Sequence, residues 1–392
     1  NMESGNIVCC TKDGFKCINK LKKVYIDQTF FETTPHPYSH WTLKEIHEQP
    51  EALLRTLNNG ARINNDVVKL GGLEMLKDKL NTLRTIILIG CGTSLNACMC
   101  AKYYFQKYAN LNTILCIDGA EFSLNDIPKD GTSLLVLCSQ SGETKDVHRC
   151  IKIGREKGIL CVGIINVVNS IIAREVDCGI YINSMRENGV ASTKSFTSML
   201  LALSLFSLWI NQETKKEHIK YIIDDIRKIS YQCCLLLKNI SVDKNILIRL
   251  NKPSLFLLGK GKMEAIAREG ALKIKEISYI HAEGCSGSAL KHGPFALLME
   301  GFPIILLIDE ENRAKMLNVY EEVKSRGAFV YIITEIKDLS LENQDIFLVE
   351  NNNNCKEILF VVVLQYIAYQ LSILNNINPD KPRNLAKVVT VE

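Results

Sequence analysis

The chain has 392 residues, of which 47% are hydrophobic and 23% are charged. This composition is that of an ordinary globular protein and excludes a chain that is disordered, collagen-like or coiled-coil throughout. At about 150 residues per domain, the length predicts two or three domains. The net charge of +4 comes from 47 Lys and Arg against 43 Asp and Glu, and it is spread too thinly to hold nucleic acid or an acidic membrane surface.

The cysteines indicate a reducing compartment. Fifteen are present, mostly inside apolar runs, and none forms a C-x-x-C pair that could begin a zinc site. We therefore expect buried thiols in a cytoplasmic protein. No secretory signal comes before the first predicted element, and the longest apolar stretch, residues 358–374, is expected to be too short and too polar to cross a membrane. Because the first residue is Asn1 rather than Met, we expect further sequence upstream.

Residues 1–60 predict a linker followed by a lead-in helix. A strand-like segment over 6–10 is followed by a turn signal at 11–14. A Pro-His-Pro sequence at 35–37 then comes before a helical stretch that starts at Thr42.

Residues 61–213 predict a first α/β domain. Short apolar runs bounded by Gly, Ser, Asn or Asp alternate with helical segments, in which apolar residues recur at spacings of three and four. Such alternation is typical of a parallel sheet with helices on both faces. The expected strands are 85–90, 133–138, 160–166 and 179–183, and the expected helices are 143–157 and 192–210.

Residues 214–374 predict a second domain of the same kind, which suggests a duplication. A polar helix over 214–239 comes first, and apolar runs again alternate with helical segments. The residues from 375 to 392 contain two prolines and no clear period, so they predict an irregular tail. The expected strands are 254–259, 302–308, 329–334 and 346–349.

Two strand-to-helix junctions in the first domain carry small hydroxyl side chains beside glycine. They are G-C-G-T-S (90–94) and S-Q-S-G-E-T (139–144). The free N–H groups of a helix N-terminus can bind an anion there, and glycine lets the backbone approach it. The alternative for either loop alone is ordinary helix capping by Ser and Thr. Two such loops on neighbouring strands favour a ligand, and because neither matches a dinucleotide or ATP motif, we expect a sugar phosphate.

The second domain holds a dense group of titratable residues along one predicted helix and the segment after it. On a helix, Lys273 and Glu276 share a face, so the carboxylate could carry a proton beside an ammonium that holds an oxyanion. Spacing alone favours the simpler alternative, a surface ion pair. The Ala-, Gly- and Ile-rich surroundings are more typical of a packed helix, and His292, which precedes Gly-Pro, becomes a candidate acid or base. The group comprises Glu269, Lys273, Lys275, Glu276, His281, Glu283, Lys291 and His292.

Seven strings occur together in the order that one enzyme family shows. They are K-E-I-H-E-Q-P (44–50), C-G-T-S (91–94), S-Q-S-G-E-T (139–144), G-V-A-S-T-K (189–194), E-G-A-L-K-I-K-E-I-S-Y (269–279), L-K-H-G-P (290–294) and P-R-N-L-A-K-V-V-T-V-E (382–392). From about residue 36 to its end, the chain resembles the isomerase half of the glucosamine-6-phosphate synthases, the glutamine:fructose-6-phosphate amidotransferases. The resemblance implies an α/β fold of two tandem SIS (sugar isomerase) domains, each a parallel sheet flanked by helices on both faces, with an irregular C-terminal tail.

The resemblance also implies roles for individual residues, without a metal or other cofactor. Glu276 would move a proton between C1 and C2 of the open-chain sugar while Lys273 stabilises charge. His292 would open the sugar ring, and Lys387 would form a Schiff base at C2. The phosphate and nearby hydroxyls of fructose 6-phosphate would be held by Thr93, Ser94, Ser139, Gln140, Ser141 and Thr144, and the sugar would be lined by Val190, Ser192 and Ala386.

Partners follow from the same resemblance. The implied ligands are fructose 6-phosphate, glucose 6-phosphate and glucosamine 6-phosphate, with UDP-N-acetylglucosamine as a feedback inhibitor. In the family, His292 would reach the active site of a partner subunit, which implies a homodimer or a higher oligomer. The family's glutaminase half needs a cysteine at its processed N-terminus, whereas Cys9 and Cys10 are internal. We therefore expect an isomerase portion that lacks its ammonia source and, alone, interconverts fructose 6-phosphate and glucose 6-phosphate.

Two alternatives to this enzyme stay open. A non-catalytic SIS-domain sensor of sugar phosphates would keep the serine loops and lose the catalytic groups, which are present here. Another SIS enzyme, such as a sugar-amine deaminase or deglycase, would share the Glu and His but fits the C-terminal string less well. One departure from the family stands at Ala289, where a Glu is usual, beside an unusual loop over 284–288. It leaves Glu276 and His292 in place and alters the electrostatics of that loop.

Overall fold

A computed structural model describes residues 7–17, 32–80, 82–212, 216–339, 341 and 345–387. The chain divides into two compact units, one up to Pro37 and one from Tyr38 onward. In the first unit, β1 (Val8–Thr11) and β2 (Gly14–Cys17) form an antiparallel hairpin. The predicted strand start at residue 6, the predicted helix start at residue 214 and the tail beyond Lys387 lie outside the described residues.

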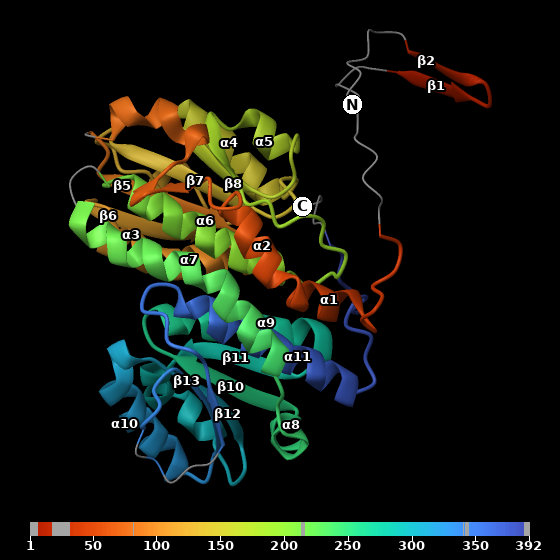
Figure 1. Cartoon of the computed structure of the whole chain (residues 1–392), viewed down its shortest axis with the longest axis vertical. Helices are drawn as coiled ribbons and strands as arrows, with labels where there is room; N and C mark the ends of the chain where they lie inside the picture. The colour runs from red at the N-terminus through yellow and green to blue at the C-terminus, as the bar shows by residue number, and fades with distance from the viewer. Residues whose placement is uncertain are drawn as a thin grey trace. The chain divides into compact units, whose positions relative to one another are not determined.

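The first half of the second unit contains a five-stranded parallel sheet in the order β6-β5-β7-β8-β9 (Figure 1). Two helices, α1 and α2, and the short hairpin β3-β4 lead into it. The strands are β5 (Thr85–Gly90), β6 (Thr113–Asp118), β7 (Ser133–Ser139), β8 (Cys161–Ile165) and β9 (Cys178–Tyr181). The other elements are α1 (Trp41–His47), α2 (Gln49–Thr56), β3 (Ile63–Asn64), β4 (Val67–Val68), η1 (Gly71–Lys79), α3 (Thr93–Tyr108), η2 (Leu124–Asp126), α4 (Lys145–Glu156), α5 (Ile171–Glu175) and α6 (Lys194–Trp209).

The second half repeats the topology with a parallel sheet in the order β11-β10-β12-β13-β14. Its strands are β10 (Ser254–Gly259), β11 (His281–Ser286), β12 (Pro303–Ile308), β13 (Phe329–Thr334) and β14 (Ile346–Leu348). Its helices are α7 (Lys216–Asn239), α8 (Lys244–Leu250), α9 (Lys262–Ser278), η3 (Gly287–His292), η4 (Pro294–Leu297), η5 (Glu310–Asn312), α10 (Arg313–Lys324) and α11 (Lys356–Leu374). The predicted duplication of α/β units with parallel sheets is confirmed.

Alternate side chains of each strand face opposite layers, as the two-residue period of a strand requires. In β5, Leu88 joins the core between the two sheets, whereas Ile89 joins the core under α4 and α5. In β10, Leu257 faces the same central core and Leu258 faces the core under α10. Figure 1 shows α3, α6, α9 and α11 between the two sheets. Both sheets are therefore covered on both faces, which explains their continuous apolar runs.

The last helix corrects one expectation. We expected residues 358–374 to be too short and too polar to cross a membrane. α11, which contains them, is 19 residues long and reaches a mean hydropathy of 1.8, so by length and composition it could cross one. In the fold, 78% of it is buried. A buried core helix passes the same test of length and hydropathy, so the finding is weak evidence for a membrane span.

Two edge strands, β6 and β11, were missed by the sequence analysis. β11 pairs in parallel with β10 along its whole length. It carries His281 and Glu283, both exposed, so its pattern looked like a cluster of titratable side chains rather than a strand. Because an edge strand packs less apolar surface than a central strand, its sequence shows a weaker hydrophobic pattern.

Candidate active site

The two hydroxyl-rich loops lie at the carboxyl end of the first sheet, where ligands of open α/β sheets bind. Gly92 adopts a positive φ of 52° just before α3, so Thr93 and Ser94 open that helix. Neither α3 nor α4 has a side-chain hydrogen bond at its N-cap residue. Capping of α4 therefore does not account for the hydroxyl group of Thr144, and the N-cap of α3, Gly92, has no side chain.

The loop over 139–144 is tied by its own side chains. Ser139 Oγ accepts the N–H of Gly142 at 2.9 Å and lies 3.0 Å from Thr144 Oγ1, while Ser141 Oγ accepts the N–H of Glu143 at 3.1 Å. Gly142 has a φ of 66°, and a Cβ there would lie 1.9 Å from Ser170 Oγ. Only glycine fits that position, so the loop has one shape before any ligand arrives.

A cavity of about 780 Å³ opens beside this loop. It brings Gln140 and Ser141 together with Lys387 from the C-terminal tail, and among the described residues its lining includes no other side chain to which the family resemblance gave a role. Its walls also include Glu187, which the sequence analysis did not select. The remaining lining residues are Arg55, Asn58, Asn59, Asn166, Val167, Val168, Asn183, Met185 and Arg186.

A buried ion cluster joins the two halves of the unit. Lys273 Nζ, on α9, donates to Glu276 Oε2 at 2.5 Å and to Thr93 Oγ1 of α3 at 2.9 Å. The Lys273 side chain is 1% exposed, so the alternative of a surface ion pair is wrong. Burial alone would lower the pKa of Lys273, but the facing carboxylates of Glu269 and Glu276, with a smaller contribution from Glu187, raise it. The ammonium is therefore stable in this site.

Glu269 is a member of this cluster to which the sequence analysis gave no role. It is fully buried and accepts hydrogen bonds from Thr93 Oγ1 at 3.1 Å and Asn96 Nδ2 at 2.9 Å. Burial raises the pKa of Glu269 to about 7, against the opposing effect of Lys273. The sequence did contain a signal for Glu269. It lies four residues before Lys273 and seven before Glu276, and residues at these spacings lie on one face of a helix.

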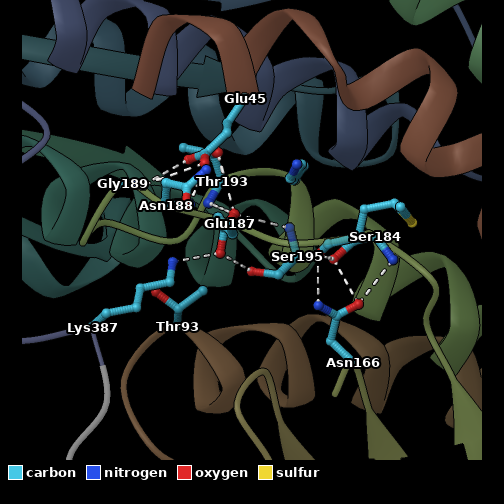
Figure 2. Close-up of polar contacts among 12 residues, drawn as sticks. Glu45, Thr93, Asn166, Ser184, Glu187, Asn188, Gly189, Thr193, Ser195 and Lys387 are labelled. Carbon is cyan, nitrogen blue, oxygen red and sulfur yellow. Dashed lines mark hydrogen bonds and ion pairs between the residues drawn. The ribbon is translucent and has the colours of Figure 1, made fainter. Parts of the chain in front are cut away.

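The tail brings a second ion pair to the cavity (Figure 2). Lys387 Nζ lies 2.7 Å from Glu187 Oε2, whose side chain is fully buried. Although burial alone would raise it, Lys387 and hydrogen bonds from Thr193 and Ser195 lower the pKa of Glu187 to about 2. A carboxylate 200 residues away in sequence gives no local signal, so Glu187 could not be found by spacing.

The other predicted site residues occupy these places. Val190 and Ser192 lie in the segment between β9 and α6, and the N–H of Val190 donates to the carbonyl of Asp380 in the tail at 3.3 Å. Ala386 is exposed next to Lys387. His292 is exposed at the end of η3, and within the described ranges none of the polar contacts of the cavity reaches it. That His292 reaches the active site of a partner subunit stays a prediction.

The arrangement has the parts that sugar isomerisation needs. A preformed hydroxyl loop faces a cavity, and Lys387 places an amine at its wall. Glu276 is the most accessible carboxylate of the α9 cluster, with 21% of its side chain exposed. A carboxylate hydrogen-bonded to a buried ammonium can exchange a proton with a neighbouring carbon while the ammonium stabilises the charge that develops.

Comparisons with known proteins agree with this architecture. The sequence profile described as SIS domain matches residues 79–208 and 248–375. A probable glutamine–fructose-6-phosphate aminotransferase (isomerizing) from Acanthamoeba polyphaga mimivirus is 40% identical over 97% of this chain and 64% of its own length. The enzyme of that name from Chlorobaculum tepidum is 33% identical over the whole chain and 66% of its own length. The chain thus spans about two thirds of the length of these relatives.

Solved structures give the same assignment. The C-terminal domain of glucosamine-fructose-6-phosphate aminotransferase from Francisella tularensis superimposes with a TM-score of 0.81 and 30% identity, covering 89% of this chain and all of that one. A glucosamine-6-phosphate deaminase from Thermotoga maritima, at 24% identity and a TM-score of 0.67, shares the fold. The chain belongs to the SIS-domain family and, within it, to the C-terminal domains of the glutamine–fructose-6-phosphate aminotransferases.

Proposed function

We propose that this chain is the sugar-phosphate isomerase portion of a glucosamine-6-phosphate synthase. It converts fructose 6-phosphate and ammonia to glucosamine 6-phosphate, and without ammonia it interconverts fructose 6-phosphate and glucose 6-phosphate. The observation that carries the proposal is the buried contact of Lys273 with Glu276 and Thr93, which joins a proton carrier to the sugar-phosphate loops. A sensor of sugar phosphates has no use for such a cluster.

The proposed chemistry uses the residues in sequence. The loop over 139–144 binds the phosphate through its N–H groups and hydroxyls. Lys387 gives up one proton, its neutral amine adds to the C2 carbonyl of the open-chain sugar, and a proton returned to the carbinolamine oxygen lets water leave as the C=N bond forms, so that the positive charge is again on nitrogen.

Ammonia then adds to C2 of this imine and expels the lysine amine, so that the sugar carries a C2 imine of its own. The positive charge of that imine acidifies the C1 hydrogens, and Glu276 carries one proton from C1 to C2 to give glucosamine 6-phosphate. Without ammonia, Glu276 carries the proton from C1 to C2 of the open-chain ketose while a proton passes from O1 to O2, which gives glucose 6-phosphate. Lys273 stabilises the negative charge that develops on the sugar oxygens.

Several partners belong to the proposal. The curated relatives are longer than this chain, and we propose that a glutaminase portion upstream supplies the ammonia from glutamine. His292, exposed on η3, would complete the active site of a second subunit in a homodimer or higher oligomer and open the sugar ring there. UDP-N-acetylglucosamine would act as a feedback inhibitor, and the pathway would operate in the cytoplasm.

An isomerase assay tests the proposal. The chain, incubated with fructose 6-phosphate alone, should produce glucose 6-phosphate until the two reach equilibrium, and should release no glutamate from glutamine. Calorimetry should show strong preference for the phosphorylated sugar over fructose. A chain that binds the sugar phosphate and never converts it would instead be the SIS-domain sensor, and a chain that binds sugar and sugar phosphate equally would have no phosphate site.

A further inference from the structure

The segment between β9 and α6 is pinned to its surroundings, so the side chain of Glu187 has a fixed direction (Figure 2). At its start, Asn166 Oδ1 accepts hydrogen bonds from the N–H and the Oγ of Ser184, both at 2.9 Å. Asn166 Nδ2 donates to the carbonyl of Met185 at 2.8 Å. Three hydrogen bonds from one side chain tie the segment to the end of β8.

The two residues after Glu187 are held by Glu45 of α1. Its carboxyl group accepts hydrogen bonds from the N–H groups of Asn188 and Gly189. A Cβ on Gly189 would lie 2.9 Å from Glu45 Oε2 and 3.1 Å from Thr42 Oγ1, so the contact depends on glycine. Glu45 is itself buried. The segment is therefore clamped on both sides of Glu187.

Glu187 turns inward and caps α6. It accepts the N–H of Thr193 at 2.8 Å, the N–H of Ser195 at 3.3 Å and the Oγ–H of Ser195 at 2.8 Å. Free N–H groups at a helix N-terminus favour an anion. The two N–H groups reach Oε1, whereas Oε2 accepts both Ser195 Oγ–H and Lys387 Nζ–H, and Lys387 lines the cavity.

Lys387 needs such a partner because its own support is weak. Residues 375–387, the described part of the tail, contain no helix or strand, and the side chain of Lys387 has four rotatable bonds. The tail is tied further back, where the Asp380 carboxylate accepts the N–H groups of Trp41 and Thr42, both at 2.8 Å. A second tie lies at Arg383, whose N–H donates to Tyr279 Oη at 2.7 Å, and three residues lie between it and Lys387. Glu187 is the contact that holds the amine itself at the cavity wall.

We infer that Glu187 is a positioning residue for Lys387, fixing its amine where the C2 carbonyl of the sugar phosphate must arrive. The inference rests on the proposed function, in which Lys387 condenses with that carbonyl. The nitrogen is positively charged at rest and in the protonated imine and is neutral only while it attacks the carbonyl, so the carboxylate matches the charged states on both sides of that step. A fixed amine reacts faster than a mobile one, since misplacement by about 1 Å can cost about 100-fold.

Borohydride trapping tests the inference. Borohydride adds hydride to C2 of the imine and leaves a stable secondary amine on lysine, which mass spectrometry of peptides assigns. In Glu187→Gln, the rate of trapping with fructose 6-phosphate should fall about 10- to 100-fold, while calorimetric affinity for the sugar phosphate stays within about twofold. Glu187→Asp, which keeps the charge, should recover part of the loss. Glu175→Gln, in an ion pair with His148 on the outer face of the first sheet, should trap at the wild-type rate.

The outcomes separate this inference from the proposed function. If the wild type traps sugar on Lys387 and Glu187→Gln traps it equally fast or faster, Glu187 has no positioning role and the proposed function stands. If the wild type traps no sugar, or traps it on another lysine, the proposed function fails. Should Glu187→Gln not fold, Ser195→Ala loosens Glu187 without changing its charge and should slow trapping about three- to fivefold; an unchanged rate overturns the inference.

Discussion

The carboxyl ends of the two sheets can be compared position by position. At the first, Gly92 with a φ of 52° precedes α3; at the second, Gly261 with a φ of 61° precedes α9. Each turn also contains a second glycine two residues earlier, Gly90 or Gly259. A Cβ on either of these would lie 2.8 Å or less from the backbone of the helix that follows. The duplicated backbone is thus the same, and both turns require glycine for the same steric reason.

The side chains differ. After β7 the first end presents serine and threonine hydroxyls beside a cavity, whereas the second end is filled by buried ion pairs. Lys356 Nζ lies 2.5 Å from Glu335 Oε1 and 4.0 Å from Asp309 Oδ2, and Lys262 Nζ lies 2.7 Å from Glu357 Oε1. A binding site needs polar groups that face open space. The fold supplies two such ends. We call the first the open end because the cavity of about 780 Å³ lies there, and the second the filled end because its charged side chains pair with one another and the cavity that Gly261 lines measures about 250 Å³.

The largest expected effect concerns Glu276, which Lys273 links to Thr93 at the open end. Glu276→Gln keeps the size of the side chain and its hydrogen bond to Lys273 but removes the proton carrier. We expect isomerisation of fructose 6-phosphate to fall about 10²- to 10⁴-fold, with sugar-phosphate affinity nearly unchanged. Steady-state rates and calorimetry measure the two quantities. Glu264→Gln, on the same helix and paired with Arg268, is the control and should keep full activity. A Glu276→Gln enzyme with the wild-type rate would reduce Glu276 to an ion-pair partner.

The next effect concerns the filled end. Lys356→Met leaves the carboxylates of Glu335 and Asp309 buried without their cation, and we expect the free energy of unfolding to fall by about 3–5 kcal/mol. Urea unfolding measures it. Lys77→Met breaks the exposed pair of Lys77 with Glu74 and should cost at most about 1 kcal/mol. An equal fall in the free energy of unfolding in the two variants would show that the buried ion pairs contribute no more to stability than an exposed one.

The next prediction concerns how Glu269 makes the free energy of unfolding depend on pH. Its pKa is raised from 4.5 to about 7 in the folded protein, so the folded state binds the extra proton between these values. The resulting stabilisation is complete below pH 4.5 and is lost as pH rises through 7, about 3 kcal/mol at most. Glu45, whose pKa burial and Glu187 raise to about 8, has the same sign. In Glu269→Gln, the free energy of unfolding should therefore decline less steeply between pH 5 and 8 than in the wild type, with Glu45 still contributing its share. The same decline in both proteins would contradict this.

The smallest effect concerns a single hydroxyl of the open end. Ser141 lines the cavity and its Oγ accepts the N–H of Glu143. Ser141→Ala removes one donor from the phosphate loop, and hydrogen bonds to charged groups contribute about 1.5–3 kcal/mol. We expect affinity for fructose 6-phosphate to fall at least about 10-fold by calorimetry. Ser325→Ala, an exposed serine on the far side of the second sheet, should bind normally, and a Ser141→Ala chain that does the same would place the phosphate elsewhere.

Much of the fold follows from the sequence because both sheets are covered on two faces. The run Thr85–Gly90 is buried throughout, and such continuous apolar runs are easy to recognise. β11 was missed because polar residues are tolerated on an edge. In the site, helical spacing paired Lys273 with Glu276 but could not show that Lys273 contacts Thr93 of α3 in the other half. Glu187 and Glu45 act through contacts 143 to 200 residues apart, which only the folded chain brings together.

Deuterium incorporation tests the central claim most directly. The chain is incubated with fructose 6-phosphate in D₂O without ammonia, and the sugar phosphates are examined by NMR spectroscopy and mass spectrometry. If the open end of the first sheet is an isomerase site, deuterium should appear at C1 of recovered fructose 6-phosphate or at C2 of new glucose 6-phosphate, and Glu276→Gln should suppress it. Fructose 6-phosphate that binds and returns with neither deuterium nor conversion to glucose 6-phosphate would contradict the account.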